Sequence, residues 1–75
     1  MADHEMDLRG LTCPIPVMRT AKKMLTLKVG QTLHVLATDP ATIPDFDAYA
    51  RGSGNEMLES KKNAKGDFEF LLKKV

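Results

Sequence analysis

The sequence contains a single cysteine and no tryptophan, and only 5% of its 75 residues are aromatic. One cysteine excludes an intramolecular disulfide and a metal cage built from several thiolates. A small secreted domain without a disulfide would be exceptional, so we expect a cytoplasmic protein. No segment approaches the roughly 18 apolar residues of a membrane span, and the acidic start lacks the basic and apolar regions of a signal peptide, so we expect no membrane partner.

An excess of charge of either sign is also missing. Eleven basic and ten acidic residues give a formal net charge of +1, which excludes a disordered charged tail and a strongly basic nucleic-acid clamp. A chain of this length is one domain, residues 1–75, and it buries only about 60–65% of the surface that the unfolded chain exposes. We therefore expect no cavity large enough to enclose a substrate.

Apolar residues follow two periods along the chain. Alternation predicts strands, and spacings of three and four predict helices that end near glycines. The expected elements are a strand at 5–8, a helix at 14–28, a strand at 32–38, a helix at 43–51, and strands at 56–61 and 68–73 joined as an antiparallel hairpin. The expected buried residues are Met6 and Leu8, then Val17, Met18, Ala21, Met24 and Leu25, then Leu33, Val35 and Ala37, and finally Ile43, Phe46 and Ala50.

The order β-α-β-α-β-β predicts an α+β fold, a two-layer α/β sandwich in which a mixed four-stranded sheet carries both helices on one face. The other face of the sheet then meets water or a partner. Leu36 and Leu71 point to that face, and this small apolar area is more typical of ordinary surface than of a binding site.

The segment Arg9–Pro16, Arg-Gly-Leu-Thr-Cys-Pro-Ile-Pro, places the lone thiol between a strand and a helix. Thr12 or Cys13 is expected to cap the helix, with Pro14 at its first position. Free backbone N–H groups and the helix dipole at that end predict a Cys13 pKa below the usual value of about 8.5, so that the thiolate could act as nucleophile, metal ligand or carrier. The alternative is that Cys13 is a small buried apolar residue.

This segment resembles the Cys-Pro-x-Pro signature of the TusA family, also called SirA-like, and the resemblance extends from about Met6 to Lys74. Residues 37–42, Asp45 and residues 54–58 support it. The family fold agrees with the sandwich expected above. The resemblance implies a sulfur carrier, or sulfurtransferase, that holds sulfur as a persulfide on Cys13.

The resemblance also implies partners and supporting residues. The sulfur donor would be a cysteine desulfurase or a rhodanese-like protein, and an acceptor protein would direct the sulfur to tRNA thiolation or to sulfur metabolism. Gly10, Pro14 and Pro16 would support the motif, and by position Arg9, Arg19 and Asp39 would form a docking or electrostatic shell. Many relatives have a cysteine where Ala50 stands and a histidine where Asn55 stands. Without a second cysteine, sulfur would pass between proteins.

Other readings of the same residues remain open. His4 and His34 have no fixed ligand spacing to Cys13, so we expect no metal, and no cofactor is expected. Met18 and Met24 are expected to fill the core. The competing functional hypothesis is a regulatory or RNA- or protein-binding module without thiol chemistry. Near-neutral charge and few aromatic residues argue against direct nucleic-acid binding. A monomer is the simplest expectation for a carrier that presents one thiol to several partners.

Overall fold

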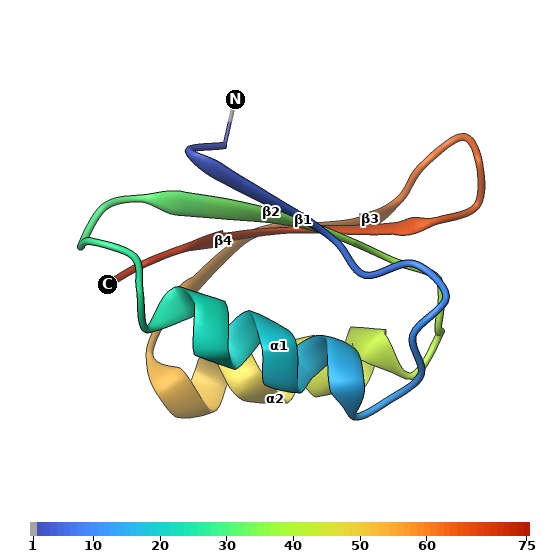
Figure 1. Ribbon diagram of the computed structural model, residues 1–75, viewed down its shortest axis with the longest axis horizontal. Coiled ribbons are helices and arrows are strands. Elements are labelled where there is room, and N and C mark those ends of the chain that lie inside the picture. Colours follow the sequence, from blue (N-terminus) through green and yellow to red (C-terminus); the bar gives the residue numbers. More distant parts are fainter. Residues whose placement is uncertain (1) are drawn as a thin grey trace.

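The computed structural model describes residues 2–75. In chain order it contains β1 (His4–Asp7), α1 (Ile15–Met24), β2 (Thr32–Ala37), α2 (Thr42–Ser53), β3 (Glu56–Lys62) and β4 (Phe68–Lys73). The strands form one sheet in the order β1-β2-β4-β3, with β1 and β2 parallel and the other pairs antiparallel. Both helices lie on the same face of the sheet (Figure 1), so the predicted two-layer fold with a mixed sheet is confirmed.

The core lies between the sheet and the helices. The central strands contribute alternate residues, as predicted, and those side chains are at most 1% exposed: Leu33, Val35, Ala37, Phe70 and Leu72. Phe46 of α2 stacks on Phe70 of β4 with ring centroids 4.3 Å apart. Alternate residues along a strand face opposite sides of the sheet, so burial on one face leaves the other polar. The Phe46–Phe70 stack joins the helical layer to the sheet.

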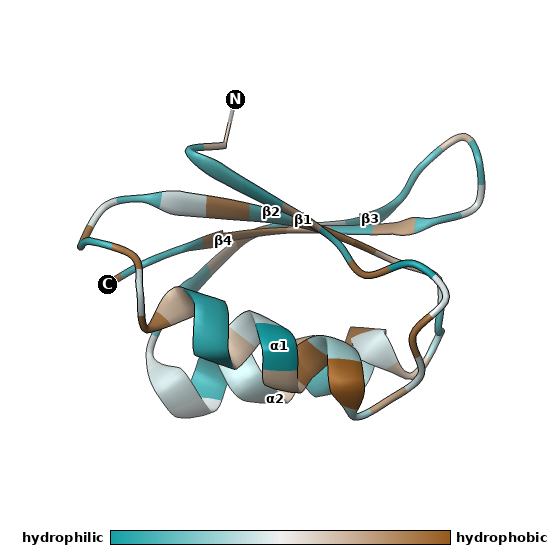
Figure 2. Cartoon of the chain, in the orientation of Figure 1, coloured by the Kyte–Doolittle hydropathy of each residue, from teal (hydrophilic) through white to brown (hydrophobic). Residues whose placement is uncertain are grey.

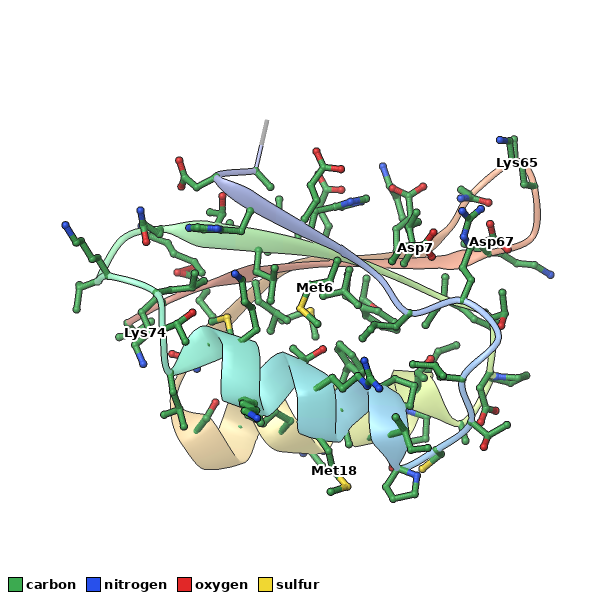
Figure 3. The ribbon with its side chains drawn as sticks, in the orientation of Figure 1. Met6, Asp7, Met18, Lys65, Asp67 and Lys74 are labelled. Carbon is green, nitrogen blue, oxygen red and sulfur yellow. The ribbon has the colours of Figure 1, made fainter. Side chains whose placement is uncertain are left out.

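Helix α1 is shorter than the predicted helix and buries only part of the predicted stripe, namely Met24 and, less completely, Val17. Pro16, Thr20 and Met24, spaced four residues apart, are buried, whereas Met18 and Leu25 are 63% and 79% exposed. The predicted burial of Met18 and Leu25 is therefore wrong, because the helix is rotated so that polar Thr20 faces the sheet. Figure 3 shows Met18 pointing away from the sheet and Met6 pointing from β1 toward the helices.

The predicted helix ends at Lys28, whereas α1 ends at Met24. The amides of Thr26 and Leu27 bond to the carbonyls three residues earlier, which tightens the chain into a turn after Met24. The turn brings Leu27 into the core at 6% exposure. Leu27, which follows the helix, is therefore buried in the core in place of Leu25, which the longer predicted helix would have buried.

In helix α2, too, the buried residues differ from the predicted ones, but at one position only. Phe46 and Ala50 are buried as predicted, but Ile43 is 44% exposed and its neighbour Thr42 is buried. The prediction for Ile43 is wrong because the buried stripe runs Thr42, Phe46, Ala50 at four-residue spacing. The Thr42 hydroxyl donates to the carbonyl of Asp39 at 2.6 Å, so this polar residue is tolerated in the core. The helix ends at Gly54 in the left-handed region, φ 79°.

The face of the sheet opposite the helices is polar, with Leu36 and Leu71 half-buried on it. His34 on this face pairs with Glu69 of the neighbouring strand, with Nε2 2.8 Å from Oε1. Neither helix in residues 2–75 has the length and apolar character required to cross a membrane.

Candidate functional site

The ends of β1 and β2 position the loop that carries Cys13. Because these neighbouring strands are parallel, their C-terminal ends meet at one edge of the sheet, and the two following loops lie together. The Gly10 amide donates to Thr38 Oγ1 at 2.9 Å, and the Cys13 amide donates to Asp39 Oδ2 at 2.8 Å. Gly10 has φ 84°, a conformation that favours glycine. Cys13 is thereby held beside the segment that leads into α2.

The prolines of the motif shape the start of α1. Pro14 occupies the N-cap position and Pro16 lies in the first turn, where the missing N–H needs no acceptor. The Cys13–Pro14 peptide is cis. The predicted cap by Thr12 or Cys13 is wrong, because no side chain in the described part of the chain caps this helix and the helix begins two residues after Cys13. Pro14 therefore lies one position earlier than predicted.

The Cys13 thiol, which is partly buried, donates a hydrogen bond to Oδ2 of Asp45 in the first turn of α2. This contact, the burial of the thiol and the nearby charge of Asp39 raise the pKa of Cys13 above its ordinary value. The predicted stabilisation of the thiolate by the helix start is therefore wrong in direction. The carboxylate of Asp45 accepts directly from the sulfur, and this hydrogen bond is the largest cause of the raised pKa.

Asp39, one of the predicted shell residues, contacts Cys13 through the backbone. Its two carboxylate oxygens accept from the Cys13 amide at 2.8 Å and from the Ala41 amide at 3.0 Å. These two bonds hold the pKa of Asp39 below its usual value. Asp39 therefore ties the motif loop to the start of α2 as an ionised carboxylate.

The two predicted arginines lie in different surroundings. Arg9 pairs with Asp7, with Nη2 2.7 Å from Oδ2, and with Asp67, with Nη1 3.5 Å from Oδ2. Figure 3 shows Asp7 and Asp67 close together at the same end of the sheet. The Arg9 bond lowers the pKa of Asp7 to about 2. Arg9 thus anchors the beginning of the motif loop to the strand ends.

Arg19 lies on the outer side of α1. With Ile15, Met18 and Lys22 it lines a shallow, mostly apolar hollow. Ile15 is the first residue of α1 and lies two positions after Cys13, so this surface begins next to the thiol. The hydrophobic segments at the beginning of α1 are visible in Figure 2.

The contact between Asp45 and the Cys13 thiol is not predicted by the residue pattern. The sequence marks Asp45 only as part of the family resemblance, because its contact with Cys13 depends on how α2 packs beside the motif loop. Ala50 is buried in the core, and Asn55 bonds to the Tyr49 hydroxyl at 3.2 Å. Within residues 2–75, no three His, Cys, Asp or Glu side chains are grouped as a metal site would require.

A family model described as sulfurtransferase TusA matches residues 4–74. The chain belongs to the TusA family. Sulfur carrier protein TusA from Allochromatium vinosum is 50% identical over 72 residues, which cover 96% of this chain and 93% of that protein. YrkF from Bacillus subtilis is 37% identical over 68 residues, which cover 91% of this chain but 37% of YrkF. The TusA domain thus matches only part of that longer protein.

The fold of this TusA-family chain is shared with a solved structure. The crystal structure of a SirA-like protein from Desulfitobacterium hafniense matches it with a TM-score of 0.84 and 27% sequence identity, over 93% of this chain and 95% of the other. The predicted resemblance to the TusA or SirA-like family is therefore confirmed by both sequence and fold.

Proposed function

We propose that this protein is a sulfur carrier that holds one sulfur atom as a persulfide on Cys13 and passes it from a donor protein to an acceptor protein. The observation that carries the proposal is the placement of the only thiol in a TusA-family chain. Cys13 lies in a loop at the rim of the fold, partly buried, and not among the core residues. A thiol at the rim can be reached by two partners in turn.

The chemistry is thiol exchange at the outer sulfur of a persulfide. The Cys13 thiolate attacks the outer sulfur of the donor persulfide, which forms an S–S bond to Cys13 and breaks the S–S bond of the donor. The inner sulfur of the donor leaves as a thiolate and takes up a proton. An acceptor thiolate later attacks the outer sulfur on Cys13 in the same way. No electrons are lost overall, so the transfer requires no cofactor.

The surroundings of Cys13 supply supporting roles in this proposal. Gly10, Pro14 and Pro16 shape the loop, and Asp39 and Arg9 anchor its two ends. Arg19 would help to dock partners, because it borders exposed apolar side chains of α1 next to the thiol.

The donor would be a cysteine desulfurase or a rhodanese-like protein, and the acceptor would decide whether the sulfur enters tRNA thiolation or another branch of sulfur metabolism. The carrier would act as a cytoplasmic monomer, because a free thiol survives in a reducing compartment and must face each partner in turn. Both properties can be measured, by fractionation of cells and by light scattering of the purified protein.

Intact mass spectrometry tests the proposal. After incubation with a cysteine desulfurase and cysteine, or with a rhodanese and thiosulfate, the protein should gain the mass of one sulfur atom, and reducing agent should remove it. Cys13→Ala is the control and should gain nothing. If the wild-type protein stays unmodified with both donors, or if Cys13→Ala gains the same mass, Cys13 is not a sulfur carrier. Salt-dependent RNA binding that survives Cys13→Ala would favour the binding-module alternative.

A further inference from the structure

Two carboxylates from outside the motif loop hold Cys13. Asp39 follows β2 and accepts from the backbone amide of Cys13, and Asp45 lies in the first turn of α2 and accepts from the thiol. The amide contact fixes the backbone, whereas the thiol contact acts on the reactive atom itself. Asp45 is therefore placed to control the protonation of the sulfur.

Within residues 2–75, neither carboxylate pairs with a cationic side chain. Other acidic residues of the structure do, since Asp7 pairs with Arg9, Asp47 with Arg51 and Glu59 with Lys61. Among the ion pairs within residues 2–75, none involves Asp39 or Asp45. Both titratable groups that act electrostatically on Cys13 are thus acidic.

This arrangement has a chemical consequence. A carboxylate that accepts a hydrogen bond from a thiol stabilises the protonated form, and the pKa of Cys13 is raised accordingly. Only the thiolate attacks a persulfide, so Cys13 is a weak nucleophile in the free protein. Sulfur uptake is then accelerated by any change that weakens the contact between Asp45 and the thiol.

We propose that Asp45 keeps Cys13 as a thiol in the free carrier, and that a cationic side chain of the sulfur-donor protein pairs with the Asp45 carboxylate and frees the sulfur to react. This inference rests on the proposed carrier function. Asp45 is a positioning residue in this scheme, because it acts through Cys13. The released thiol gives its proton to solvent, the thiolate takes the outer sulfur of the donor persulfide, and the departing donor thiolate takes a proton from solvent.

The charge and the accessibility of Asp45 both favour a cationic partner group. Asp45 is half-buried at the start of α2, so part of this residue is open to a docking partner. A positive charge placed beside it would offset its effect on the thiol and would itself favour the thiolate. A donor without such a group would meet Cys13 in its protonated form, so the contact would also select among donors.

The pH dependence of Cys13 alkylation tests whether Asp45 stabilises the protonated thiol. We expect Asp45→Asn to lower the alkylation pKa of Cys13 by about one unit, which raises the thiolate fraction near neutral pH about tenfold. Asp45→Ser should shift it in the same direction. Asp47→Asn is the matched control, because Asp47 lies in the same helix and pairs with exposed Arg51. An unchanged alkylation pKa in folded Asp45→Asn and Asp45→Ser, judged by circular dichroism, would overturn the inference.

The role of the donor cation is tested by comparing two sulfur sources. With glutathione persulfide, which brings no protein cation, Asp45→Asn should load Cys13 several-fold faster than the wild-type protein. With a cysteine desulfurase and cysteine, the variant should gain little or lose rate, because the donor already neutralises Asp45. Equal gains with both sources would contradict the donor-cation step. If no source loads Cys13, the carrier function fails, whereas the alkylation profile still tests the Asp45 contact independently.

Discussion

At the scale of single residues, the Cys13 site is defined by carboxylates that lie far from it in the sequence. Asp39 is separated from Cys13 by 26 positions and Asp45 by 32. The motif itself predicts where the thiol lies along the chain, between a strand and a helix. The direction in which the thiol points depends on α2, so the sign of its pKa shift follows from packing between distant segments.

Asp39 should make the stability of the protein depend on acid pH. Its pKa is lower in the folded state, so it stabilises the fold above the unfolded pKa of about 3.9, and this contribution is lost as the pH falls through the folded pKa. Asp39→Ala should therefore lower the melting temperature at pH 6, and the difference from the wild-type protein should shrink below about pH 4. Circular dichroism melts from pH 6 to pH 3 measure this.

Asp47→Ala is the control for the acid titration. It removes only the exposed ion pair with Arg51, so its melting temperature should follow that of the wild-type protein closely. A constant difference between Asp39→Ala and the wild-type protein across the whole pH range would show that the Asp39 carboxylate contributes through packing and not through its charge.

At the scale of elements, the sequence predicts the order and type of every helix and strand, but it assigns some exposed residues of both helical segments to the core. Apolar periodicity counts Met18, Leu25 and Ile43 as buried because they are apolar, whereas the structure buries Thr20 and Thr42 in the corresponding stripes. A pattern of apolar residues cannot predict the burial of a polar residue. The rotation of a short helix is decided instead by the loops that attach it to the sheet.

The two buried threonines predict opposite effects of the same substitution. The Thr20 hydroxyl of α1 has no hydrogen-bond partner in the described structure, whereas the Thr42 hydroxyl of α2 donates to the Asp39 carbonyl. Replacement by valine keeps the shape and removes the hydroxyl. We expect Thr20→Val to raise the free energy of unfolding by about 1 kcal/mol and Thr42→Val to lower it by about 1 kcal/mol. Urea denaturation of both variants measures the two changes.

The pair of threonine variants serves as its own control, because the chemical change is identical in both. A loss of stability in Thr20→Val would mean that its hydroxyl bonds to a group other than those described. A neutral Thr42→Val would mean that its bond to Asp39 contributes no net stability, and that the start of α2 is held by the backbone alone.

At the scale of the whole molecule, one small core joins two helices to one face of a four-stranded sheet, and Cys13 lies at the edge of this core. The mixed sheet follows from the element order because a strand-helix-strand unit gives a parallel pair and the final hairpin gives an antiparallel pair. The contact between α2 and the motif loop does not follow from that order. It depends on how far α2 lies along the sheet, which the Phe46–Phe70 stack helps to fix.

Because Phe46 anchors α2 to the sheet, its replacement should affect both the fold and the thiol. A domain of this size has a free energy of unfolding of about 4–11 kcal/mol, and truncation of a buried phenylalanine to alanine costs about 3–5 kcal/mol. Phe46→Ala should therefore lose a large part of the stability in urea, whereas Met18→Ala, at a 63% exposed position, should stay within about 0.5 kcal/mol of wild type. In Phe46→Ala the Cys13 alkylation pKa should also fall toward about 8.5 as α2 loosens and Asp45 withdraws. A destabilised Phe46→Ala that keeps the raised alkylation pKa of Cys13 would show that Asp45 holds the thiol independently of the core.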